Sequence, residues 1–150
     1  MSLRAATRGV NHEEEWAWSV SNETTLNALV VDDMLPDRVK VGWHPVFGEE
    51  FPTPHSDDLV VFEDYFYRGF GVPIHPFLHG LIDYYNISLC NLSLNSILHV
   101  AIFINFCEAY LGILPHFDLF RYFFCLKIRR GGDLDLELWA PPIYRFGMGW

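Results

Sequence analysis

The sequence predicts an α+β domain that is mostly α, with three to four packed helices and a small two-stranded sheet. At 150 residues the chain is long enough for one domain that buries roughly two-thirds of its unfolded surface. Apolar residues make up 51% of the chain and aromatic residues 17%, which excludes a disordered protein. Helical spacing of apolar side chains recurs in four segments, whereas strand-like composition or alternation is found mainly in two.

The domain boundaries follow from this pattern. Residues 1–20 show no sustained period, and we expect them to form a flexible N-terminal tail. We expect residues 21–150 to form a single domain. The chain stops on Trp150 without a polar tail, so we also expect this domain to be truncated at its C-terminus.

Charge is unevenly distributed along the chain. The formal net charge is −9, and residues 1–65 hold 4 basic and 13 acidic side chains. Residues 66–150 hold 6 of each, so the aromatic core is neutral. Overall acidity argues against binding nucleic acid through the bulk electrostatic field, although a local basic patch could still bind it.

The compartment is predicted from the cysteines and the N-terminus. Cys90, Cys107 and Cys125 are an odd number, widely spaced among apolar residues and without a CxxC pattern. We expect reduced thiols in a reducing compartment. The N-terminus has no apolar segment typical of a secretory signal. The protein is therefore predicted to be intracellular, nuclear or cytoplasmic, and not secreted.

The first helix is predicted over residues 24–35, where apolar side chains recur along one face. Thr24 or Thr25 can cap its N-terminus, because a hydroxyl oxygen can accept from a free backbone N–H. Pro36 ends the helix.

The two strands are predicted over residues 59–67 and 133–139. The first is rich in Val, Phe and Tyr, and the second alternates Leu with Asp or Glu. Between them, Gly69 and Gly71 permit turn geometry that is closed to other residues. Pro73 then fixes the entry into the next helix. The GxGxxG pattern of a phosphate loop is absent.

A second helix is predicted over residues 76–85. His75 and His79 have the four-residue spacing of helical metal ligands. Position 76 is Pro, however, so the HExxH pattern is not met. We expect structural or surface histidines and no metal site.

The central helix is predicted over residues 96–111, with Asn95 or Ser96 as its cap. It is apolar almost all round, which is typical of a helix buried on several sides. Residues 98–114 are apolar enough to raise the question of a membrane span. The segment is shorter than the required 20 residues or so and carries Glu108, so we expect a core helix and no membrane.

The polar residues of this region are predicted to be structural, His99 among them. Glu108 either lies at the helix edge in water or pairs with Arg121 or His116, and a structural pair is favoured over a catalytic acid. Gly112 and Pro115 end the helix.

The last helix, predicted over residues 116–127, should pack against the central helix as a hairpin. Phe123 and Phe124 are expected to fill the space beside Phe103 and Phe106.

A basic cluster follows this helix. Lys127, Arg129 and Arg130, with Arg121 one turn or more earlier, could contact nucleic-acid phosphates. The three charges could equally be solvated and complement the C-terminus of the preceding helix.

No catalytic constellation emerges from the sequence. GxSxG is absent, and His99 lies two turns from Cys107, about 12 Å along a helix axis and too far for a hydrogen bond. We therefore expect no enzyme activity, no catalytic residues and no cofactor.

A series of short motifs runs through the chain in a fixed order: LNAL at 26–29, FPTP at 51–54, VVFE at 60–63, RGFGVP at 68–73, HPF at 75–77, NSILH at 95–99, CEAYLGI at 107–113 and PHFDLF at 115–120. In order and spacing, over roughly residues 24–132, these motifs resemble the plant "putative gypsy-type transposon" domain family. The chain departs from the family pattern at Leu94 and Ile128, where the family usually has Pro. The family domain normally runs on beyond the end of this chain.

The resemblance implies a product or relic of plant transposable elements. It carries over no catalytic residues, and the three carboxylates around two metal ions that a DDE nuclease needs are not identifiable. We therefore expect a non-enzymatic interaction or assembly domain whose partner is a protein, either itself or one encoded by the element. The alternative is a nucleic-acid-binding module that uses the basic cluster at 127–130.

Overall fold

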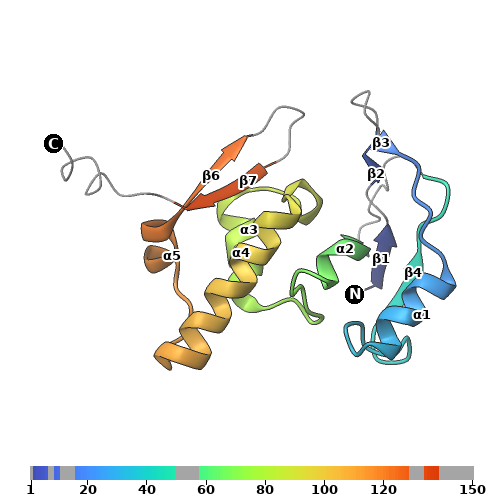
Figure 1. Cartoon of the computed structure of the whole chain (residues 1–150), viewed down its shortest axis with the longest axis horizontal. Helices are drawn as coiled ribbons and strands as arrows, with labels where there is room; N and C mark the ends of the chain where they lie inside the picture. Colours follow the sequence, from blue (N-terminus) through green and yellow to red (C-terminus); the bar gives the residue numbers. More distant parts are fainter. Residues whose placement is uncertain (1, 7–8, 11–15, 50–57, 129–133, 139–150) are drawn as a thin grey trace, which may run out of the picture.

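The structure, a computed structural model, describes residues 2–6, 9–10, 16–49, 58–128 and 134–138. The predicted α+β, mostly helical class is confirmed. In Figure 1, α2 lies between an N-terminal sheet with α1 on the right and α3, α4 and α5 on the left. Buried side chains from both parts form one hydrophobic cluster.

The N-terminal sheet has the strand order β4-β1-β5 and is entirely parallel. Its strands are β1 (Ser2–Ala6), β4 (Gly42–Pro45) and β5 (Asp58–Phe62). β1 is the central strand, and Leu3, Ala5 and Ala6 are fully buried. The flexible tail predicted for residues 1–20 is therefore wrong for Ser2–Ala6, because pairing on both sides and burial hold this segment in the core.

A second pair, β2 (Gly9–Val10) and β3 (Trp16–Ala17), is short and antiparallel. The first helix, α1, spans Glu23–Val31 and so ends four residues earlier than predicted. Its cap is Asn22, whose side chain accepts hydrogen bonds from the backbone N–H groups of Thr24 and Thr25. The Thr25 hydroxyl oxygen accepts from the Asn22 N–H and completes a capping box.

The strand predicted over residues 59–67 is wrong in its second half, because β5 passes directly into α2 (Glu63–Phe66). Glu63 lies in the first turn of α2, where a carboxylate is favourable. It is buried, and it accepts hydrogen bonds from the Ser21 and Thr25 hydroxyl groups. This polar contact connects α2 to the start of α1.

The C-terminal helices are α3 (Pro76–Tyr85), α4 (Leu94–Asn105) and α5 (Phe117–Phe123). A short 3-10 helix, η1 (Leu89–Asn91), precedes α4, and α4 continues without a break into the π-helical turn η2 (Phe106–Leu111). Fully buried Tyr65 ties α2 to this part, because its hydroxyl donates to the Leu92 carbonyl at 2.5 Å and to the Leu89 carbonyl at 3.2 Å.

An aromatic cluster holds the three helices together. The Phe103 ring lies 5.3 Å from Phe77 and 5.1 Å from Phe120, measured between centroids. Phe124 stacks on Phe120 at 4.8 Å. The predicted packing beside Phe103 is thus correct for Phe124. It is wrong for Phe123 and Phe106, which are 36% and 43% exposed.

The last helix ends at Phe123 rather than at residue 127, and Phe124–Ile128 forms strand β6. β6 pairs antiparallel with β7 (Leu134–Leu138). The predicted sheet of 59–67 with 133–139 is therefore wrong, since β5 pairs with β1. The hairpin is fixed to α4 by Asp135, whose carboxylate accepts from the Ser93 hydroxyl at 2.6 Å.

Candidate interaction surface

The central helix buries only one stripe of its surface. In Leu94–Leu111 the buried residues recur every three or four positions: Ser96, Ile97, Val100, Phe103 and Cys107. The other residues of this helix, most of them apolar, are half-buried or exposed, and 28% of this segment is buried. The predicted burial on several sides is therefore wrong.

Several large apolar side chains on the second half of this helix and just after it are exposed, and we call this set the apolar ridge. Its members are large apolar side chains that are 41–81% exposed: Ile102, Phe106, Tyr110, Leu111, Ile113 and Leu114. A fully exposed large side chain offers about 150–250 Å², so the ridge presents roughly 600 Å². That is the upper end of what a monomeric protein usually exposes in one patch, about 300–600 Å².

The fold explains why the ridge projects. Beyond α4 the helix runs past the neighbouring elements towards the lower left of Figure 1. It ends at Gly112, whose φ of 65° is a left-handed conformation suited to glycine. Pro115 then turns the chain back towards α5. The last two turns of the helix therefore extend beyond the part of the bundle that could cover them.

By length and composition alone, the helix Leu94–Leu111 could also cross a membrane, with a mean hydropathy of 1.4. The core helix of a soluble protein, which is mostly buried, passes the same test, whereas 28% of this segment is buried.

A hollow lined mainly by apolar side chains includes residues that directly follow the ridge in the chain, and we call it the apolar groove. It has a volume of about 440 Å³ and is formed where the start of α5 meets α3. The rings of Tyr84 and Phe117 approach to 4.2 Å along it. Its lining is mostly aromatic, aliphatic or proline: Pro76, Phe77, Gly80, Leu81, Tyr84, Pro115, His116 and Phe117.

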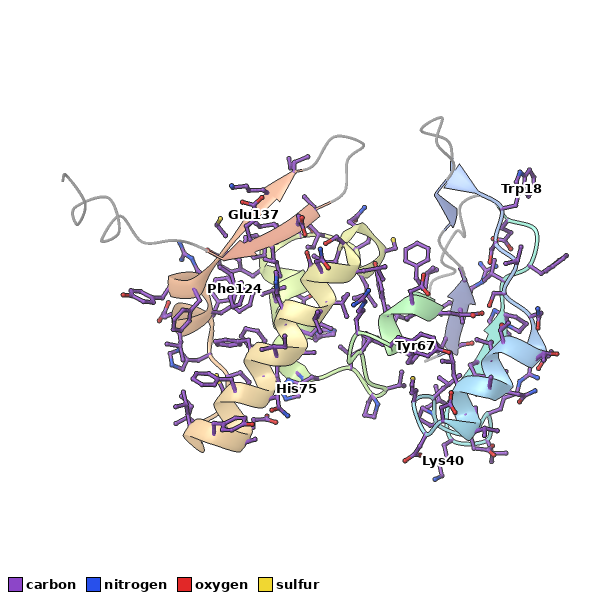
Figure 2. All side chains as sticks on the ribbon, viewed as in Figure 1. Trp18, Lys40, Tyr67, His75, Phe124 and Glu137 are labelled. Atoms are coloured by element: carbon purple, nitrogen blue, oxygen red, sulfur yellow. The ribbon has the colours of Figure 1, made fainter. Side chains whose placement is uncertain are left out.

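A second hollow, of about 460 Å³, is lined in part by His75 and Glu108, which are hydrogen-bonded to each other. His75 Nδ1 accepts a hydrogen bond from the Phe77 N–H at 3.1 Å and so caps α3. In the neutral imidazole the proton therefore sits on Nε2, which lies 2.9 Å from Glu108 Oε1. Figure 2 shows His75 beside α4. Both ring nitrogens are engaged, which leaves neither as a free base or metal ligand.

This pair gives Glu108 a partner that differs from the two predicted from the sequence. The carboxylate contacts His75 rather than Arg121 or His116. His79 pairs separately with Asp83 at 3.1 Å. Among the residues that the structure describes, no group of His, Cys, Asp and Glu could hold a metal ion.

The other residues predicted to be structural occupy caps, turns and close contacts. His99 Nδ1 donates to the Leu136 carbonyl at 2.9 Å, and the imidazole packs on Phe124. His116 Nδ1 caps α5 by accepting from the Leu119 N–H at 3.3 Å. Pro73 follows a cis peptide bond.

The glycines of this loop differ in their surroundings. Gly69 has a φ of 87°, and a Cβ there would lie 2.8 Å from the Ala101 Cβ. Gly71 faces open space.

Of the four basic residues predicted as possible nucleic-acid contacts, the structure describes Lys127 and Arg121. Lys127 forms an ion pair with Glu137 on the adjacent strand, and this hydrogen bond raises the pKa of Lys127. The Arg121 guanidinium lies over the Phe117 ring, 5.7 Å from its centroid. Arg129 and Arg130 lie outside the described residues. The structure therefore does not bring these four cations together as one described patch.

The comparisons with known proteins point to one family. Residues 60–128 match the family model described as "Putative gypsy type transposon". The resemblance predicted from the sequence is confirmed for this segment. No curated protein and no solved structure matches the chain. Both the apolar ridge and the apolar groove lie wholly within the matched segment.

Sequence reasoning missed both surfaces. The signal for the ridge was the central helix itself. It is mostly apolar up to Gly112 and Pro115, and the chain contains few other helices long enough to cover it. The groove depends on how α3 and α5 meet, which local patterns do not determine.

Proposed function

We propose that this transposon-related domain is a non-enzymatic protein-interaction module. The observation that carries the proposal is the apolar ridge, roughly 600 Å² of exposed side chains on the end of one helix and the loop that follows it. Burying apolar area of this size is a substantial driving force for association, at about 25 cal/mol per Å² before the costs of binding are subtracted.

The chemistry of the ridge favours a protein over a lipid or nucleic acid. None of its six members is cationic, whereas helices that lie on membrane surfaces carry Lys and Arg beside their apolar face. Nucleic acid requires cations that are available to phosphates. Lys127 is the one basic residue of the 127–130 cluster that the structure describes. Its ammonium group forms an ion pair with Glu137.

The other parts of the proposal rest on the family and on the thiols. We also propose an origin in a plant transposable element, and the family match supports the relation to a transposon. An intracellular location, nuclear or cytoplasmic, is consistent with Cys90, Cys107 and Cys125, none of which is joined in a disulfide in the described part of the chain.

Site-specific photocrosslinking in cells tests the proposal. Benzoylphenylalanine replaces Tyr110, which is 79% exposed on the ridge, or Val39, which is 96% exposed in the loop before β4. We expect protein adducts from position 110 and none from the control position. The absence of adducts at 110 would contradict the proposal.

Nucleic-acid binding is the competing function and is measured on the same protein. Fluorescence anisotropy with a DNA duplex at 50 and 200 mM salt detects binding through phosphates, which weakens steeply with salt. We expect no salt-dependent binding. Binding that is lost in a variant with Lys127, Arg129 and Arg130 all changed to Ala would establish the alternative.

A further inference from the structure

We propose that the partner of the ridge is a second copy of this chain, and that the ridge of each copy enters the apolar groove of the other. This inference rests on the proposed function and specifies its partner. Three features of the described residues support it: the ridge and groove are adjacent along the chain, the area of the ridge suits a dimer, and neither is charged.

The adjacency comes from the chain itself. Leu114, the last member of the ridge, is 81% exposed and is followed directly by Pro115, His116 and Phe117, which line the groove. The ridge and part of the groove lining are therefore consecutive along the chain. A two-fold axis between them would place each projection opposite the partner's hollow, which is the self-complementary arrangement of a symmetric dimer.

The ridge projects and the groove is hollow, so the two can fit together. Tyr110 and Leu114 are the two most exposed members of the ridge and project from its end. The groove has a volume of about 440 Å³, which is within the usual range of about 300–1,000 Å³ for binding pockets. Gly80 is one of its lining residues, and no atom lies within 4 Å of the position a Cβ would take there.

The area is also sufficient. A stable interface buries about 800 Å² on each partner. The ridge alone presents roughly 600 Å², which is at the lower end of the roughly 600–1,000 Å² that each partner buries in a standard interface.

The charge on this part of the chain permits contact between identical copies. The net charge of −9 belongs to residues 1–65, whereas residues 66–150, which hold the ridge and the groove, carry 6 basic and 6 acidic side chains. The members of the ridge and the lining of the groove include no Asp, Glu, Lys or Arg. The carboxylate of Glu108, on the same helix, is paired with His75.

The first test is sedimentation equilibrium of the full chain across micromolar concentrations. We expect a dimer, and we expect the double variant Tyr110→Asp/Leu114→Asp to associate at least tenfold more weakly. Val31→Asp/Val39→Asp is the matched control, because it adds the same charge at two sites that are 83% and 96% exposed. The control should remain dimeric.

The second test fills the groove instead of changing the ridge. Gly80→Leu places a side chain in open space on α3 and improves helix propensity, so the monomer should fold normally. We expect it to weaken the dimer at least tenfold, and Gly80→Ala, which adds one methyl group, to weaken it much less. Far-UV circular dichroism and thermal unfolding verify that each variant is folded.

Three results would overturn the inference. The wild-type chain could be monomeric throughout, both variants could dimerise like the wild type, or the ridge could bind phosphatidylcholine vesicles in a Tyr110/Leu114-dependent manner. A monomeric chain that still gives adducts with a different protein at position 110 would reject the second copy alone and leave the proposed function intact.

Discussion

Cys107 shows how burial changes the chemistry of one side chain. Its thiol is fully buried, while Cys90 and Cys125 are partly exposed. Burial raises the pKa of the Cys107 thiol above its ordinary value of 9.0, and the nearby Glu108 carboxylate raises it further. The thiol therefore stays protonated and unreactive, since the thiolate is the nucleophile.

We predict that iodoacetamide at pH 8 alkylates Cys107 at least about tenfold more slowly than the other two cysteines, which serve as internal controls. Because the folded pKa is raised, the stability contributed by neutral Cys107 is fully present below about pH 9 and is lost as the pH rises further. Peptide mass spectrometry over a time course measures the three rates. Equal rates would contradict the assigned burial.

For single residues, the sequence predicted the kind of contact that Glu108 makes but not the residue that it contacts. A structural pair was expected for Glu108, and one is present, but with His75, 33 residues away. That contact depends on His75 capping α3 and on α3 meeting α4. Neither Arg121 nor His116 could be excluded from spacing alone, because both lie on the next predicted helix.

Among the elements, long periodic segments were predicted well and their ends poorly. The predicted helix 76–85 agrees with α3, because Pro76 at its start and Asn86 in a left-handed conformation at its end are strong local signals. Residues 124–127 were predicted as helix but form part of β6. Their apolar spacing fits either structure, and pairing with β7 decides between them.

The contact between the Gly69 loop and α4 yields a prediction at this scale. Gly69→Ala combines a left-handed backbone with a methyl group 2.8 Å from the Ala101 Cβ. We expect it to lower the free energy of unfolding by about 2–3 kcal/mol, the cost of strain together with overpacking.

Gly71→Ala is the matched control, because its methyl group meets open space. We expect a change within about 0.5 kcal/mol. Urea unfolding followed by circular dichroism measures both variants. If the two alanines have the same effect, the close approach of the loop to α4 is wrong.

At the scale of the whole molecule, the sequence did not indicate how distant segments pair. β1 contacts β4 and β5, which lie some 40 and 56 residues further along the chain, as in Ser2 with Gly42 and Asp58. Five residues are too few to show a clear period, and parallel pairing leaves no hairpin turn as a local signal. The same limit applies to the groove between α3 and α5.

The position of β1 in the core predicts that its buried side chains contribute to stability. Leu3 is fully buried in the core that joins both parts of the molecule, so Leu3→Ala should remove packing that a flexible tail would not provide. We expect a loss of about 2–5 kcal/mol in the free energy of unfolding. Val39→Ala, at a site 96% exposed, should change it by less than about 0.5 kcal/mol. Urea midpoints at constant m-value measure both, and a Leu3 variant as stable as the control would return residues 2–6 to the status of a tail.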